Sequence, residues 1–180
     1  MFVEDVLYFM GEKEKRQETL SVNWLVSVLI HFPEIFALNF NVNKHRFKFS
    51  YMVNKELEEK YFFDFKEVLL ENLNAYDDIF LKKPANSNAF KTIFNGLTLI
   101  EIVREIRTIS LDEIHIVNSV MLNQFEQHLI SEKSEKLNEF KDDLMRHEEL
   151  IKHLTINYSS SKQENIFAFR QEGKVFIFDK

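Results

Sequence analysis

The sequence contains no cysteine, and only three glycines and two prolines occur among its 180 residues. Without cysteine, the chain cannot form a disulfide, a thiolate nucleophile, an iron–sulfur cluster or a zinc site with cysteine ligands. Gly11, Gly96 and Gly173 are too far apart in sequence to share one phosphate-binding loop or a nucleophile elbow. We therefore expect none of the common loops that bind ATP, NAD or FAD, and no cofactor.

The scarcity of glycine and proline also bears on the fold. Three glycines and two prolines make 5 of 180 residues, against roughly 12% in an average protein. This scarcity argues against long flexible linkers and against an all-β fold rich in tight turns. A chain of this length with 45% hydrophobic residues can bury a core of its own. We expect a single helix-rich α+β domain over residues 1–180, with one sub-boundary in the loop 82–88.

Positive charge is also in short supply, since 23 Lys and Arg face 29 Asp and Glu, for a net charge of -6. This sign opposes general attraction to nucleic acid or anionic lipid, so any basic site must be local. Residues 1–10 include Glu4 and Asp5 but no Lys or Arg, and so lack the basic region of a secretory signal. The apolar runs are shorter than the about 20 residues that span a membrane. We expect a cytoplasmic, bacterial-type protein without membrane contact.

Helical patterns occupy much of the chain before residue 131. Apolar residues at helical spacing, together with capping signals, define these segments. Capping boxes begin at Asp64, Thr98 and Ser110, each with a Glu three residues later. The expected helices are residues 3–10, 22–31, 64–80, 99–107 and 111–130.

Two segments show the alternation that is typical of β-hairpins. In the first, residues 36–40 and 45–51 flank a polar turn at residues 41–44. In the second, residues 166–170 and 175–178 flank Glu172 and Gly173, which would oppose Phe167 to Phe178 and Phe169 to Phe176. We expect both hairpins to join one sheet that packs against the helices.

The first hairpin carries the only local cluster that suggests phosphate contact. Lys44, Arg46 and Lys48 alternate with Phe47 and Phe49, so the pattern predicts one basic face and one aromatic face. Three cations on one strand face could follow a nucleic-acid backbone. The alternative is a half-buried strand whose charged side is simply solvated. In either case we expect the basic side chains outside and the aromatic ones in the core.

A heptad pattern over residues 131–158 predicts a long helix in the second half of the chain. Its core-type positions, all apolar except His147, follow steps of three and four residues. They are Leu137, Phe140, Leu144, His147, Ile151 and Leu154. This stripe is either the seam of a homodimer or a face that packs on the sheet of its own chain, because neighbouring apolar residues widen it.

The sequence offers no convincing catalytic or metal-binding group. His128 with Glu132, and Glu149 with His153, are spaced so that each pair shares a helix face, but two-residue matches of this kind are common. No Ser or other nucleophile is spaced beside a base in a recognisable motif. We therefore assign no catalytic, cofactor-binding or metal-binding residue from the sequence.

These observations favour an intracellular, non-enzymatic protein-interaction or regulatory protein that self-associates, as a homodimer, and binds an unidentified protein partner. One alternative is a nucleic-acid-binding accessory protein that uses the face of Lys44, Arg46 and Lys48. A second alternative is a hydrolase or metal enzyme with an unfamiliar carboxylate or histidine site.

Overall fold

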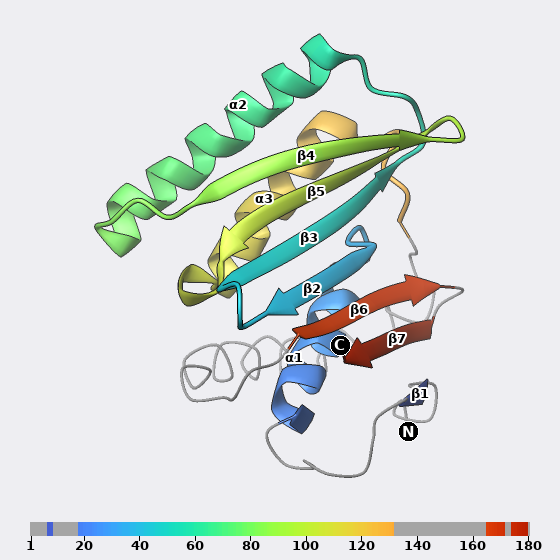
Figure 1. Ribbon diagram of the computed structural model, residues 1–180. Helices are drawn as coiled ribbons and strands as arrows, with labels where there is room; N and C mark the ends of the chain where they lie inside the picture. Colours follow the sequence, from blue (N-terminus) through green and yellow to red (C-terminus); the bar gives the residue numbers. More distant parts are fainter. Residues whose placement is uncertain (1–6, 9–17, 132–164, 172–173, 180) are drawn as a thin grey trace.

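The computed structural model describes residues 7–8, 18–131, 165–171 and 174–179. Within these residues, seven strands form one sheet in the order β1-β7-β6-β2-β3-β5-β4 (Figure 1). The strands are β1 (Leu7–Tyr8), β2 (Ala37–Asn41), β3 (Arg46–Val53), β4 (Ser87–Phe94), β5 (Leu97–Glu105), β6 (Asn165–Gln171) and β7 (Lys174–Asp179). Neighbouring strands are antiparallel except for β1 and β7, which are parallel. Together with the helices, this sheet confirms the α+β class.

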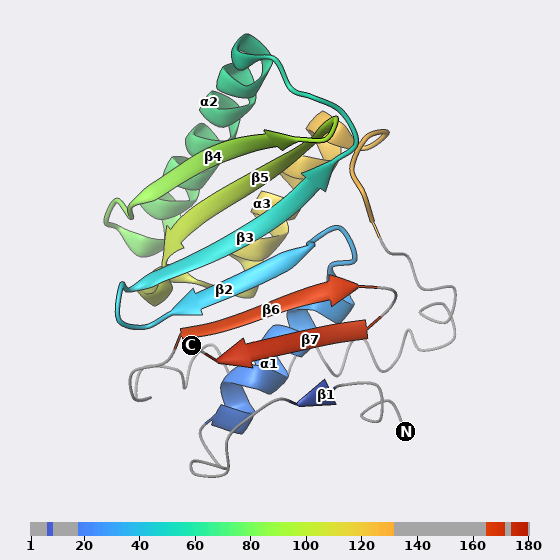
Figure 2. The same ribbon diagram turned by 45° about the vertical axis from the view of Figure 1, so that its right-hand side comes forward.

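The described helices lie on one side of this sheet, behind it in the views of Figures 1 and 2. They are α1 (Glu18–His31), α2 (Glu59–Tyr76) with a π-helical turn η1 (Asp77–Leu81), a 3-10 turn η2 (Ile106–Thr108), and α3 (Leu111–Phe125). α1 packs on β2, β6 and β7, whereas α2 packs on α3 and β4. The fold is therefore a two-layer arrangement with one helix-covered face and one open face among the described residues.

The alternation along β3 decides which side chains enter the core. Phe47, Phe49 and Tyr51 are fully buried, as the sequence predicts. Trp24 of α1 meets the Phe47 ring edge-on at 5.2 Å between centroids. The Tyr51 hydroxyl donates a 3.3 Å hydrogen bond to Asn118 of α3. The odd-numbered residues of β3 thus face the helices, and the even-numbered residues lie on the open face.

The expectation of a helix over residues 99–107 was wrong, because residues up to Glu105 belong to strand β5 and the last two lie in the 3-10 turn η2. Its burial alternates with period two, so that Ile100 and Ile102 enter the core, which only an extended chain can achieve. The hydroxyl of Thr98, expected as a helix cap, instead donates to the Lys55 carbonyl at 2.7 Å and accepts from the Leu57 amide at 3.0 Å. The expected cap at Ser110 is confirmed, since Ser110 Oγ accepts a hydrogen bond from the Glu113 amide at 3.1 Å.

Three other expectations need correction at the ends of the elements. Leu7 and Tyr8 pair with β7 instead of lying in a helix, because an exposed strand edge is available to them. α2 begins at Glu59, before the expected cap at Asp64. α3 ends at Phe125, after which Leu129 forms a β-bridge with Val53. The expected long helix at residues 131–158 lies outside the described residues except at its first position.

Candidate functional site

The open face of the sheet carries rows of side chains that are set by the strand register. One row runs from β4 to β7, and its members are Asn88, Val103, Lys48, Asn39, Phe167 and Phe178. The next row is Phe90, Glu101, Ser50, Ala37, Phe169 and Phe176. The polar and charged residues of these two rows lie on β2, β3, β4 and β5, together with Val103, Phe90 and Ala37, whereas all four positions on β6 and β7 are phenylalanines.

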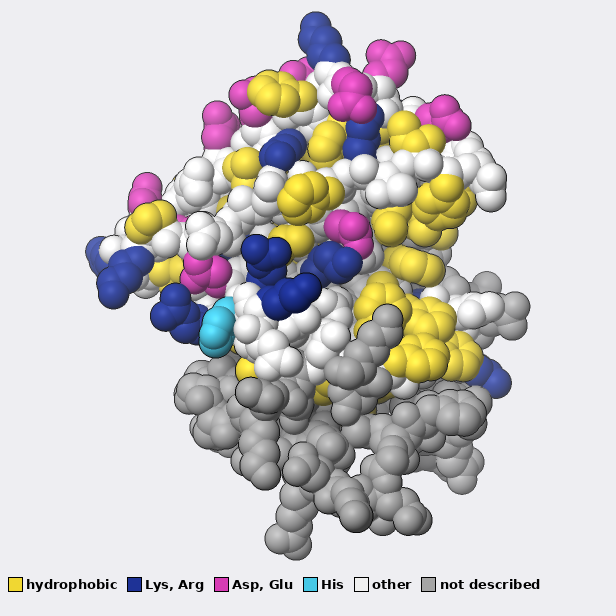
Figure 3. All heavy atoms as spheres, viewed as in Figure 1, with side chains coloured by type: hydrophobic (Ala, Val, Ile, Leu, Met, Phe, Trp, Pro, Cys, Tyr) yellow, Lys and Arg dark blue, Asp and Glu magenta, His cyan; other side chains and the backbone are white. Residues whose placement is uncertain are grey.

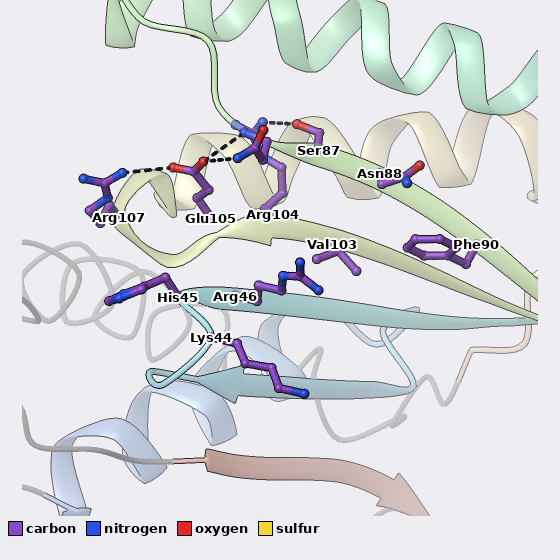
Figure 4. Close-up of a pocket in the computed structure, with 11 residues that line it drawn as sticks. Lys44, His45, Arg46, Ser87, Asn88, Phe90, Val103, Arg104, Glu105 and Arg107 are labelled. Carbon is purple, nitrogen blue, oxygen red and sulfur yellow. Dashed lines mark hydrogen bonds and ion pairs between the residues drawn. The ribbon is translucent and has the colours of Figure 1, made fainter.

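A hollow of about 680 Å³ lies where the β2–β3 turn meets the end of β5 and the start of β4 (Figure 4). Basic and amide side chains contribute to its lining, namely Lys44, His45, Arg46, Arg107, Asn86 and Asn88. The volume is within the range of roughly 300–1,000 Å³ that is common for ligand sites. Glu105 also lines the hollow, where its carboxylate contacts Asn86 at 2.8 Å and Arg107 at 3.4 Å. Because cations outnumber this one carboxylate, the lining suits an anion with several acceptor oxygens.

The cations at this hollow differ in how far they are already neutralised. Lys48, beside it on β3, forms a 2.5 Å ion pair with Glu101. Arg107 makes only a 3.4 Å contact with Glu105, and its side chain is 81% exposed. Among the described residues, no carboxylate lies within ion-pair distance of Lys44 or Arg46. Figure 3 shows Lys and Arg side chains gathered over this part of the open face.

A buried charged cluster lies against the same end of the sheet, on its helix side. Arg104 of β5 contacts Glu113 of α3 through Nε at 2.7 Å and Nη2 at 2.8 Å. It also contacts Asp77 of η1 through Nη2 at 2.8 Å and Nη1 at 3.3 Å, and it donates to Ser87 of β4. Asp77 in turn accepts from the Ala85 amide at 3.0 Å. One guanidinium thereby joins η1, β4, β5 and α3.

The electrostatics of this cluster indicate a structural role. Burial lowers the pKa of Arg104, but hydrogen bonds and charges from Glu113 and Asp77 outweigh burial, so the net pKa lies above its ordinary value. Burial raises the pKa of Glu113, although Arg104 acts in the opposite direction. The side chains of all three residues are at most 1% exposed, so neither carboxylate can reach a substrate. This cluster is therefore a clamp and not a reaction centre.

Strand β4 is the outermost strand on its side of the sheet (Figures 1 and 2). It is eight residues long and carries exposed apolar side chains: Phe90 is 49% exposed, Ile93 43% and Phe94 41%. Asn95 and Gly96, both with positive φ, form the two-residue turn into β5. A long apolar edge strand is a template for pairing with another strand.

A second apolar surface lies over β6 and β7, visible as a continuous patch in Figure 3. Phe169 stacks on Phe176 at 5.3 Å and on Phe178 at 5.7 Å between ring centroids, and Phe167 lies 5.9 Å from Phe169. Phe178 is 40% exposed, and the other three rings are partly exposed. We call these four residues the phenylalanine patch.

The structure brings only some of the sequence candidates together. Lys44 and Arg46 line the hollow, whereas Lys48 is paired with Glu101 beside it. The heptad positions 137–154 lie outside the described residues, as do Glu132, Glu149 and His153. Across the part of the chain that the structure describes, no three His, Asp or Glu side chains gather as a metal site would require.

Sequence reasoning missed both Arg107 and the clamp residues. The pattern predicts a helix that includes Arg107, and such a helix gives no indication that Arg107 lies near the β2–β3 turn. A signal for Arg104 was present, since this residue follows Ile100 and Ile102 at intervals of two on a β-branched segment. A charged residue in the buried register of a strand requires a buried partner.

No helix in the described portion of the chain is long and apolar enough to cross a membrane. Comparison of the chain with protein-family models, with curated proteins and with solved structures finds no match.

Proposed function

We propose that this chain is a non-enzymatic, self-associating interaction protein, and that two copies pair through the edges of their β4 strands. The observation that carries the proposal is the eight-residue strand β4, whose outer edge is unpaired among the described residues and carries the exposed side chains of Phe90, Ile93 and Phe94. Unless they are paired or covered, such edges expose both backbone groups and apolar area. β4 of a second copy would pair with these backbone groups and cover the apolar side chains.

The backbone of β4 is suitably oriented for such pairing. Phe94 and Leu97 flank a two-residue turn and therefore form a hydrogen-bonded pair. Hydrogen-bonded and non-hydrogen-bonded pairs alternate from there, so Ile93 and Lys91 direct their N–H and C=O groups away from β5. These are the groups that a partner strand would bind.

The side chains select one register for two antiparallel copies. If Thr92 lies opposite Thr92 of the second copy at the twofold axis, each Phe90 lies opposite a Phe94. Each Lys91 then lies opposite an Ile93 instead of another Lys91, and its charge is already met by Glu59 at 2.9 Å. Aromatic and Thr–Thr pairs across strands are favourable, whereas like charges directly opposite are not. This register therefore matches apolar groups without facing two charges.

Sedimentation velocity of the full chain and three variants tests this contact. Ile93→Pro removes an outward N–H, a position where an edge strand tolerates proline. Thr92→Lys places two charges opposite each other at the twofold axis. We expect a dimer for the wild type and monomers for both variants, with unchanged circular dichroism spectra.

Phe178→Lys is the matched control, because it also adds a charge to an exposed apolar site on the open face. We expect this variant to remain dimeric. A monomeric wild type, or dissociation by Phe178→Lys but not by Thr92→Lys, would contradict pairing through β4.

A further inference from the structure

We propose that the open face binds single-stranded nucleic acid, with phosphate groups in the hollow and bases on the phenylalanine patch. The inference is independent of pairing through β4, since the cations and the aromatic residues it requires lie elsewhere on the face. It rests on three features of the described residues: two cations with no carboxylate within ion-pair distance, a neighbouring amide donor, and partly exposed aromatic rings on the same side of the sheet.

The phosphate-binding part consists of Lys44, Arg46 and Arg107. Lys44 and Arg46 have no carboxylate within ion-pair distance among the described residues, and the Glu105 contact of Arg107 is long and exposed. Cations that are not already neutralised gain most from an incoming phosphate. The side-chain amide of Asn88 adds a donor on the opposite wall of the hollow, whereas the amide of Asn86 is bound to Glu105 at 2.8 Å. Figure 4 shows that Lys44 comes from the β2–β3 turn, Arg46 from the start of β3, Arg107 from the turn after β5, and Asn88 from the start of β4.

The base-binding part is the phenylalanine patch. Arg46 is in register with Asn41 and Asn165, so Phe167 lies two strands away from Arg46 across the sheet and two residues further along β6. At about 4.8 Å between strands and about 3.3 Å per residue, the backbones of Arg46 and Phe167 are about 12 Å apart. A flexible strand of a few nucleotides can reach both parts, with its bases stacking on aromatic rings.

A single strand fits this surface better than a duplex does. Stacking on the phenylalanine patch requires bases whose faces are free, and bases in a duplex are already stacked on each other. The net charge of -6 also makes a broad electrostatic footprint unfavourable, so binding depends on a few local phosphate contacts. Three cations therefore predict a modest and measurable salt dependence.

Fluorescence anisotropy with a labelled oligothymidylate of about 12 nucleotides measures these contacts. Three phosphate contacts give an expected slope of about -2 for log K against log salt concentration. Lys44→Gln and Arg46→Gln are each expected to reduce that slope by about 0.7. Phe178→Ala is expected to weaken binding about 5-fold or more while leaving the slope unchanged. Lys60→Gln, an exposed change on α2, is the control and should alter neither quantity.

Competition experiments identify the source of the phosphate. We expect unlabelled single-stranded oligonucleotide to compete, and free phosphate, thymidine monophosphate and the matching duplex to compete far more weakly. The proposal is overturned if no single strand binds at low salt, or if the Lys44→Gln and Arg46→Gln slopes equal that of the wild type. It is also overturned if the mononucleotide competes as well as the oligonucleotide, because the hollow would then serve a small ligand.

Discussion

Replacing Arg104 with methionine removes the cation of the clamp while keeping most of its unbranched stem. Arg104, Asp77 and Glu113 are almost completely shielded from solvent, with side chains at most 1% exposed. The substitution leaves two carboxylates in the interior without a positive charge, and Ser87 without its guanidinium donor. The substitution therefore tests how strongly the packing of β5, α3 and η1 depends on one side chain.

We expect Arg104→Met to lower the free energy of unfolding by about 3–5 kcal/mol at neutral pH, the usual cost of removing one partner of a buried ion pair. Much of that cost is the desolvation of the remaining carboxylates and not the loss of attraction itself. Asp77→Asn and Glu113→Gln added to Arg104→Met should therefore recover part of the loss. Arg107→Met, at an exposed ion pair, should cost less than about 1 kcal/mol.

The loss of stability in Arg104→Met should depend on pH, and the ionisation of Glu113 sets the sign of that dependence. Burial raises the pKa of Glu113 above its ordinary value of 4.5, so the folded state holds this proton more tightly than the unfolded state does. Its contribution to stability is fully present below that ordinary value and is lost as the pH rises through the folded-state pKa. Arg104 lowers the same pKa, so removing Arg104 raises it further and widens this window.

Urea denaturation of wild type, Arg104→Met, the triple variant and Arg107→Met, at about pH 5 and about pH 8, measures these effects. The deficit of Arg104→Met should be larger at the higher pH. A deficit below about 1 kcal/mol, or one equal at both values, would refute the conclusion that uncompensated buried carboxylates destabilise the variant.

Two further predictions concern the core. Burial and the charge of Glu34 raise the pKa of Tyr51, so the folded state keeps this proton and the protein should lose stability above about pH 10. Tyr51→Phe should reduce this loss of stability in thermal melts at alkaline pH, and a variant that loses as much stability as the wild type would contradict the prediction. Ile177→Ala, on the buried face of β7, should lower the free energy of unfolding by about 2–5 kcal/mol. Phe178→Ala should lower it clearly less, because this side chain is 40% exposed. Equal losses in urea denaturation would contradict the burial of Ile177.

The sequence was informative where one periodicity dominated a segment. The alternation of Phe47, Phe49 and Tyr51 with charged residues admits one register with a buried aromatic face, because a slip of one residue would expose all three rings. Ser110 was also recognisable as a cap, since its serine is followed by a glutamate and an apolar helical run.

The segment 97–105 was misinterpreted because a local motif competed with tertiary structure. Thr98 and Glu101 match a capping box, but this four-residue signal contributes only about 0.5–2 kcal/mol. The β-branched run beyond it gains more by burying Ile100 and Ile102 in the sheet. Because the segment is a strand and not a helix, the positions of Arg104 and Arg107 could not be predicted, nor could the clamp and the wall of the hollow to which they belong.

The hollow could not be derived from spacing along the chain. Arg46 and Arg107 are 61 positions apart in the sequence, and only the pairing of β3 with β5 brings their segments together. Ion pairing is equally hard to infer from sequence, since nothing local shows that Glu101 neutralises Lys48 while no described carboxylate lies within ion-pair distance of Lys44.

Mixing two oppositely charged variants tests pairing through β4 most directly. Thr92→Lys and Thr92→Glu place like charges at the twofold axis of each homodimer but opposite charges in the mixed pair. Sedimentation velocity should show each variant alone as a monomer and the equimolar mixture as a heterodimer. If each variant alone remains as dimeric as the wild type, or if the mixture stays monomeric while the wild type is a dimer, two copies do not pair through β4 in this register.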